Sequence, residues 1–270
     1  MSVLNIDRRI NLKKEYQSVK EDFAEAVLDR AENIIKKEVL IKSTYQSHFG
    51  MYELAILQTE VERRMILRKL ELANDYMKSD KDIDENKIRE IAESEQLGLI
   101  EIIENKKERI QKANDYLKRN RLNSREKERM RDSLKLLTLK LHPVLSKRAD
   151  EKSVMILERA LDAFIDDNYG KMRMLENILD VSCEKEENLD EKTMIQEIER
   201  IRKAIADEVM QAALEKKEKV FEMEEFVFDL EKVEAQKEAL KNELKIEQKS
   251  RDDLKYKLDL LEKIYNFNVE

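Results

Sequence analysis

The residues best placed to do chemistry lie in one short stretch, 139–144, which reads Leu-Lys-Leu-His-Pro-Val. It contains the only proline of the chain and one of its two histidines. Pro143 predicts the end of a helix, because proline lacks a backbone N–H and fixes φ. The sequence around it is typical of charged helix, so this turn is the one interruption with a possible chemical meaning.

A purely structural interpretation of the same turn is also open. On that interpretation Pro143 stops the helix, and His142 caps the last helical carbonyls or packs across the loop. The other histidine is His48, and neither histidine belongs to a His-Glu-x-x-His motif. We therefore expect no metal site.

The sequence also lacks the common catalytic and nucleotide-binding motifs. It contains no phosphate loop, no dinucleotide fingerprint and no nucleophile elbow. Its three glycines, Gly50, Gly98 and Gly170, lie too far apart to form a glycine-rich phosphate cradle. We expect no catalytic residue and no cofactor, and hence a protein that is not an enzyme.

Two amphipathic helices are expected to position the turn. The first begins near Ser124, a candidate N-cap, and its apolar stripe follows helical spacing. The second follows Pro143 and closes at Asp166-Asp167-Asn168. The stripe of the first helix is Met130, Leu134, Leu137 and Leu141, and that of the second is Ile156, Leu157, Ala160, Ala163 and Phe164.

This pair of helices resembles a J-domain, the DnaJ-type co-chaperone module. The stretch 134–143, Leu-Lys-Leu-Leu-Thr-Leu-Lys-Leu-His-Pro, is similar to the family's basic helix and the start of its His-Pro-Asp loop. The stretch 160–164, Ala-Leu-Asp-Ala-Phe, is similar to the family's Ala-x-x-Ala-Tyr segment. The resemblance covers residues 124–170, and the wider layout resembles bacterial proteins with a J-like hairpin between coiled-coil arms.

The resemblance implies a DnaK-type ATPase as partner, docked on His142, Pro143 and Val144 beside Lys135 and Lys140. Two positions depart from the family pattern. Val144 stands where the family has aspartate, and its side chain cannot accept a hydrogen bond or balance a charge. Leu136 stands where the family has a lysine or arginine. The resemblance therefore indicates a degenerate J-domain-like module more clearly than it indicates stimulation of an ATPase.

Composition indicates an all-α protein of long helices and coiled coils that flank this small hairpin. The chain of 270 residues is 41% hydrophobic and 42% charged, with 6% aromatic residues and no tryptophan. Cys183 is the only cysteine, which excludes an intrachain disulfide and suits a reducing compartment. No stretch approaches the about 20 apolar residues that cross a bilayer. We expect a cytoplasmic protein with no membrane contact.

Charge is distributed unevenly along the chain. Residues 106–148 carry 15 basic and 5 acidic side chains, a net charge of +10, although the whole chain has a net charge of -7. The acidic segments of the same chain are the nearest partners for this basic segment. Nucleic acid is a less favoured partner, because no aromatic residues are interleaved and no known binding motif accompanies the charge.

Three consecutive segments are predicted along the chain. Residues 1–119 form a long antiparallel helical hairpin with a turn at 79–84 and a weak point at Gly50. Residues 120–182 form the J-like module. Residues 183–270 form an acidic linker and a coiled-coil arm, a continuous helix of about 75 residues that either acts as a spacer or folds against the N-terminal helices. Where Glu247 and Arg251 occupy its seam, this arm should pair weakly, bend or fray.

The preferred functional prediction is a non-enzymatic protein–protein interaction or scaffold protein. The alternatives are a co-chaperone that recruits a DnaK-type ATPase and a protein that binds nucleic acid through residues 106–148. The helix seams could also close between two chains, which would give a homo-oligomer.

Overall fold

A computed structural model describes residues 3–79, 84–119, 121–146, 149–179 and 189–265. All regular structure in these residues is helical, which confirms the predicted all-α class. The contacts within the chain define two compact units. Unit 1 consists of Met1–Leu40 and Arg119–Glu222, and unit 2 consists of Ile41–Lys118 and Met223–Glu270. Each unit is thus drawn from two separate parts of the chain, and the three consecutive domains remain a prediction.

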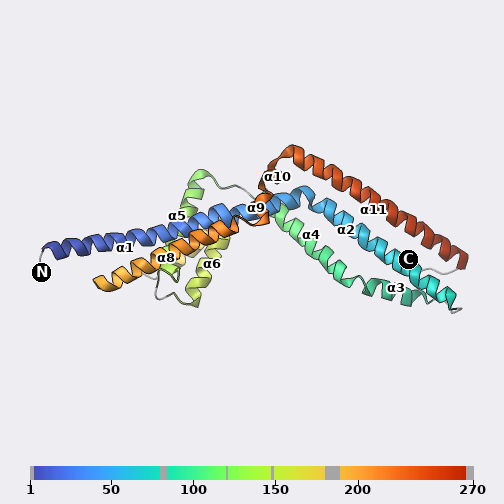
Figure 1. Cartoon of the computed structure of the whole chain (residues 1–270), viewed down its shortest axis with the longest axis horizontal. Coiled ribbons are helices and arrows are strands. Elements are labelled where there is room, and N and C mark those ends of the chain that lie inside the picture. Colours follow the sequence, from blue (N-terminus) through green and yellow to red (C-terminus); the bar gives the residue numbers. More distant parts are fainter. Residues whose placement is uncertain (1–2, 80–83, 120, 147–148, 180–188, 266–270) are drawn as a thin grey trace. The chain divides into compact units, whose positions relative to one another are not determined.

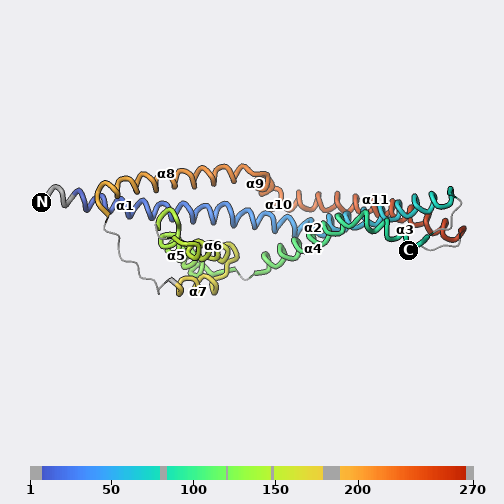
Figure 2. Tube along the Cα trace, turned by 90° about the horizontal axis from the view of Figure 1, so that it is seen from below, coloured from blue at the N-terminus to red at the C-terminus, as the bar shows by residue number. Residues whose placement is uncertain are grey.

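Unit 1 is built on a parallel pair of helices, α1 (Val3–Arg30) and α8 (Glu191–Glu215). Glu15 pairs with Arg202 at 2.7 Å, and Arg30 pairs with Glu215 at 2.6 Å, so residue numbers rise together along both helices. Figure 2 shows α8 beside α1 along this length. Apolar side chains from Val19 to Val27 pack between the two helices with Ile198 and Ile201.

Three further helices of unit 1 form a small bundle on α1. They are α5 (Ser124–Leu141), α6 (Glu151–Ile165) and α7 (Tyr169–Leu179). The predicted stripes of α5 and α6 face each other in one core, to which α7 adds Met172 and Leu175 and α1 adds Leu28. We call α5, α6 and the turn between them the hairpin. Its pairing through the predicted stripes is confirmed.

The start of α5 differs by one residue from the prediction. Asn123, not Ser124, is the N-cap, and its side chain accepts a hydrogen bond from the Glu126 backbone N–H. The Glu126 carboxylate accepts a hydrogen bond from the Asn123 N–H in return, which completes a capping box. Asparagine is as good an N-cap as serine, and only Asn123 has a glutamate three residues later.

The long N-terminal helical run contains a short π-helix. The π-helical segment η1 (Ala31–Lys36) separates α1 from α2 (Lys37–Lys78). The sequence predicted a weak point at Gly50 instead, but α2 passes through Gly50 as an unbroken helix. A Cβ atom at Gly50 would lie 2.7 Å from Cγ1 of Ile110, so the glycine permits a close approach of two helices rather than a kink.

Unit 2 places α2 between two other helices, as Figure 1 shows. On one side lies α4 (Leu97–Lys118), which runs antiparallel to α2: Glu53 pairs with Lys106, and Arg68 pairs with Glu95 just before α4 begins. This arrangement confirms the predicted fold-back. On the other side lies α11 (Leu230–Tyr265), which runs parallel to α2, because Phe49 packs with Val233 and Ala73 packs with Leu258.

The predicted second helix, 85–118, is divided in two. Helix α3 (Glu85–Ser94) ends before a turn at Glu95 and Gln96, and α4 follows. The predicted turn at 79–84 is described only at its ends, with 80–83 outside the described residues. There Asp84 acts as the N-cap of α3 and accepts a hydrogen bond from the Lys87 N–H at 3.0 Å.

The C-terminal arm folds against the N-terminal helices, which is one of the two predicted arrangements, but the prediction of one continuous helix is wrong. Two short helices, α9 (Lys219–Glu222) and α10 (Glu224–Phe228), separate α8 from α11. At the predicted weak seam, Glu247 and Arg251 form partly exposed ion pairs with the α2 residues Arg63 and Glu62 at 3.1 and 3.0 Å. Ion pairs of this kind contribute little to stability, so weak pairing at this point stays a prediction. At this point the contact between α11 and α2 is therefore made by charged residues of opposite sign, where the heptad pattern would have required apolar residues. The predicted linker and Cys183 lie outside the described residues.

Candidate functional site around the His-Pro-Val turn

His142 ends α5 through its backbone and packs through its side chain. Its N–H donates to the Thr138 carbonyl at 3.0 Å, and its Nδ1 accepts a hydrogen bond from the Val144 N–H at 3.2 Å. The imidazole meets the Phe23 ring of α1 edge to face, with 4.8 Å between ring centroids. Burial lowers the pKa of His142, and an accepting Nδ1 also requires the neutral ring. The residue thus behaves as a packed, neutral cap.

Val144 joins the apolar contact between α1 and α8. Its half-buried side chain packs against the cluster that includes Val19, Phe23 and Ile201. Its carbonyl accepts a hydrogen bond from the Arg200 guanidinium of α8 at 2.6 Å. Pro143, between these two packed residues, is exposed. Two of the three turn residues therefore face the chain's own helices.

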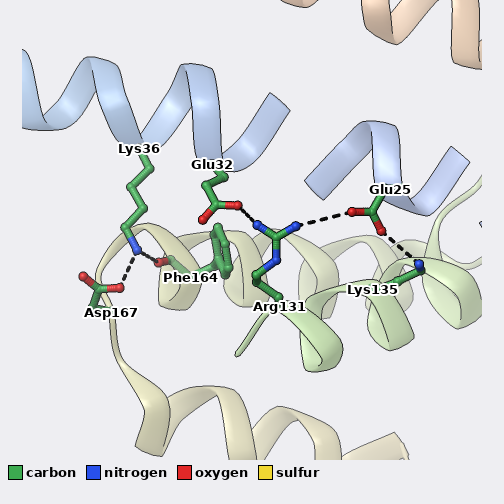
Figure 3. A network of polar contacts seen from close by, with 7 residues as sticks. All are labelled: Glu25, Glu32, Lys36, Arg131, Lys135, Phe164 and Asp167. Atoms are coloured by element: carbon green, nitrogen blue, oxygen red, sulfur yellow. Dashed lines mark hydrogen bonds and ion pairs between the residues drawn. The ribbon is translucent and has the colours of Figure 1, made fainter. Parts of the chain in front are cut away.

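Two basic side chains of α5 are paired with two acidic side chains of the first helical run (Figure 3). Lys135 donates to Glu25 of α1 at 2.9 Å, and Arg131 bridges Glu25 at 3.3 Å and Glu32 of η1. We call Glu25, Glu32, Arg131 and Lys135 the charge cluster. The hydrogen bond from Lys135 lowers the pKa of Glu25, and the same bond raises the pKa of Lys135. The acidic part of the chain thus supplies the partner expected for the basic segment.

A second polar contact holds the far end of the hairpin. Lys36 of η1 donates to the Phe164 carbonyl at 3.4 Å and pairs with the Asp167 carboxylate, as Figure 3 also shows. Its ammonium lies 5.0 Å from the centroid of the Phe164 ring. Asp167 follows the C-terminus of α6 with a left-handed φ of 53°. A cation at this helix end meets the Phe164 carbonyl and the negative end of the helix dipole.

The five predicted docking residues are thus placed in different environments. His142 and Val144 pack on α1 and α8, Lys135 is paired with Glu25, Pro143 is exposed, and Lys140 is partly buried. They do not form one open surface. Leu136, which stands at a position that the J-domain family fills with a basic residue, is 40% exposed.

Most partners of these residues could not be predicted from the sequence. Glu25, Glu32, Lys36 and Arg200 belong to charged helices in which every turn offers similar side chains. The only available signal was the net charge of the segments, which predicted that acidic residues of the same chain would meet the basic segment. Nothing in the local sequence around these four residues distinguishes them from their neighbours.

The described residues contain no group of three or more histidine, cysteine, aspartate or glutamate side chains that could hold a metal ion. No helix in the described part of the chain is long and apolar enough to cross a membrane. Comparison with known proteins found no matching family model, no matching curated protein and no matching solved structure. The resemblance to a J-domain therefore remains a prediction from residues 124–170.

Proposed function

We propose that this chain is a non-enzymatic scaffold protein that acts through protein–protein contacts, and that its J-like hairpin is a fixed structural module. In this proposal the hairpin is bound to the parallel helices α1 and α8, and the His-Pro-Val turn makes the contact with both of them. The hairpin spaces and orients the helices of unit 1, and partners bind elsewhere on the chain.

The observation that supports this proposal is the packing of the turn. Val144 lies in the cluster between α1 and α8, and Arg200 binds its carbonyl at 2.6 Å. A docking loop needs its side chains free for the partner, whereas these side chains already have partners within the chain. The pairing of Lys135 with Glu25 supports the same conclusion for the basic helix, because a bound cation must lose this partner before it meets another.

The test is an ATPase assay with a DnaK-type chaperone. We expect no stimulation by the native chain and none by Val144→Asp, because the new carboxylate would face apolar side chains of α1 and α8. Val144→Ala is the matched control, since it removes the same packing without adding charge. Stimulation by the native chain at concentrations where a known J-domain works would refute the proposal.

A co-chaperone is the second candidate, favoured by the hairpin itself. Helices α5 and α6 pack through Leu134, Leu137, Ala160 and Phe164 on either side of a His-Pro turn, as the resemblance expects. This candidate requires the hairpin to leave α1. Glu25→Ala combined with Phe23→Ala should weaken the contact between the hairpin and α1. The triple variant that also carries Val144→Asp should then stimulate the ATPase of the chaperone. If this triple variant remains inactive while circular dichroism shows native helicity, the co-chaperone candidate fails.

A further inference from the structure

The outer face of α11 in unit 2 carries an exposed apolar stripe. Its inner face packs on α2 through Val233, Leu240 and Leu258. The outer stripe consists of Ile246, Tyr256, Leu260 and Ile264, of which Ile246 is 68% exposed and Ile264 is 71% exposed. These four large apolar side chains belong to none of the apolar clusters formed by the described residues of unit 2.

Helical geometry places the ends of this stripe on one line. Ile246 and Ile264 are 18 residues apart, which is about five full turns at 3.6 residues per turn. Asp253 and Lys257, both exposed, lie between them and within about 20° of the same line. Within about 20° of this line, the order from the N-terminal to the C-terminal end is Ile246, Asp253, Lys257 and Ile264, that is, apolar, acidic, basic, apolar. Leu260 and Tyr256 flank the line on one side, about 40° and 80° from it.

We propose that this face binds the same face of a second copy of the chain, with the two α11 helices antiparallel. A two-fold axis at the level of residue 255 brings Ile246 opposite the partner's Ile264. The same axis brings Asp253 opposite the partner's Lys257, and symmetry repeats both contacts. In the antiparallel pair, each of these four residues therefore meets a suitable residue of the second copy: apolar meets apolar, and acidic meets basic.

Charge decides the orientation of the pair. In a parallel pair in register, Asp253 would meet Asp253 of the partner subunit, and Lys257 would meet Lys257 of the partner subunit, so both contacts would be repulsive. The antiparallel pair makes both attractive.

The expected dimer is weak. The stripe is about 27 Å long at about 1.5 Å per residue. A single pair of helices over that length buries less than the about 1,600 Å² of a standard stable interface. We therefore expect a concentration-dependent equilibrium of the full chain rather than an obligate dimer. This inference goes beyond the proposed scaffold function and does not depend on the hairpin.

Sedimentation equilibrium of the full chain over a hundredfold range of concentration tests the proposal. The native chain should shift from monomer to dimer. Asp253→Lys and Lys257→Asp should each raise the dissociation constant by about tenfold, because each variant makes both symmetric contacts repulsive. An equimolar mixture of the two variants should restore native affinity, because the two lysines of one variant then face the two aspartates of the other at both contacts.

The controls distinguish this contact from other causes. Lys245→Asp changes an exposed charge about 100° from the line that joins Ile246 and Ile264 and should leave the dissociation constant unchanged. Circular dichroism of each variant verifies that the helices are intact. A chain that stays monomeric throughout would overturn the proposal. A dimer that is indifferent to both reversals, or a mixture that does not recover affinity, would overturn it equally.

Disulfide trapping gives an independent test of the orientation. In a Cys183→Ser background, chains with Ile246→Cys and chains with Ile264→Cys should cross-link to each other when mixed. Each variant alone should cross-link poorly, because equal positions lie far apart in an antiparallel pair. Efficient cross-linking of either variant with itself would show a parallel pair and overturn the assignment.

Discussion

Unit 1 and unit 2 both contain a parallel pair of helices from distant parts of the chain, but the third member is held differently in each. In unit 1 the hairpin is held on α1 and η1 by ion pairs, by apolar contacts of its turn, and by Leu28 and Ala31, which enter its core. In unit 2, α4 is held on α2 by an apolar cluster, by the ion pair of Lys106 with Glu53, and by a close approach of Ile110 to the backbone at Gly50. Both attachments thus combine apolar packing with ion pairs, and the close approach at a glycine is what unit 2 adds.

The two kinds of contact should respond differently to mutation. Apolar packing loses several kcal/mol when one buried side chain is truncated, because a cavity remains. A partly exposed ion pair contributes far less, because water and salt already screen its charges. The hairpin of unit 1 is useful here because it contains both types of contact on a single helix, α5.

The largest expected effect is in the apolar core of unit 1. Leu137→Ala should lower the free energy of unfolding by about 2–5 kcal/mol, because Leu137 is fully buried between α5 and α6. The neighbouring Leu136→Ala is the matched control, since Leu136 faces solvent and its truncation should change stability by no more than about 0.5 kcal/mol. Thermal and urea denaturation monitored by circular dichroism measure both. Equal losses in the two variants would contradict the assignment of the buried face.

The next effect tests the close approach in unit 2. Gly50→Ala should destabilise by about 1–3 kcal/mol, because its Cβ would meet the buried Ile110 at 2.7 Å and Gln46 at 2.9 Å. Gly98→Ala is the control, because nothing lies within 4 Å of its Cβ position. That change should stabilise by up to about 1 kcal/mol through helix propensity. If both alanines stabilise the chain, α2 and α4 are not in close contact at Gly50.

Much of this fold could be predicted from sequence, but the partners of each helix could not. The stripes of α5 and α6 and the stop at Pro143 follow from helical periodicity and proline chemistry, and all lie where expected. The break between α8 and α11 was missed because it contains no proline or glycine; its signals were weaker, a run of valine and phenylalanine at 220–228 and Asp229, whose side chain accepts from the Lys232 N–H at the start of α11. The pairing of Glu247 with Arg63 was missed because heptad patterns register apolar seams and not complementary charges.

The candidate site shows the same limit more sharply. The sequence identified His142, Pro143 and Lys135 as the unusual residues, and the structure gives His142 and Lys135 specific contacts. It could not show that those contacts lie within the chain. Val144 illustrates the reason: valine in a turn suits either an exposed loop or a packed joint, and only the position of α1 and α8 decides between them.

The smallest effect concerns the polar attachment of the hairpin. A double-mutant cycle with Glu25→Ala and Lys135→Ala should give a coupling energy of about 0.2–1 kcal/mol at neutral pH and low salt, because both side chains are partly exposed. Chemical denaturation of the four proteins supplies the cycle. Lys127→Ala, at an exposed position of the same helix, should not couple to Glu25→Ala.

The pH dependence of this coupling has a defined sign. Lys135 lowers the folded-state pKa of Glu25 below its usual 4.5. The unfolded chain therefore takes up the proton first as pH falls, so the stabilisation is fully present above pH 4.5 and is lost as pH falls through the lower folded pKa. At every pH above the folded-state pKa of Glu25, added salt should lower the coupling energy between Glu25 and Lys135. A coupling that persists in acid and in high salt would mean that Lys135 contributes through the packing of its methylene stem and not through its charge.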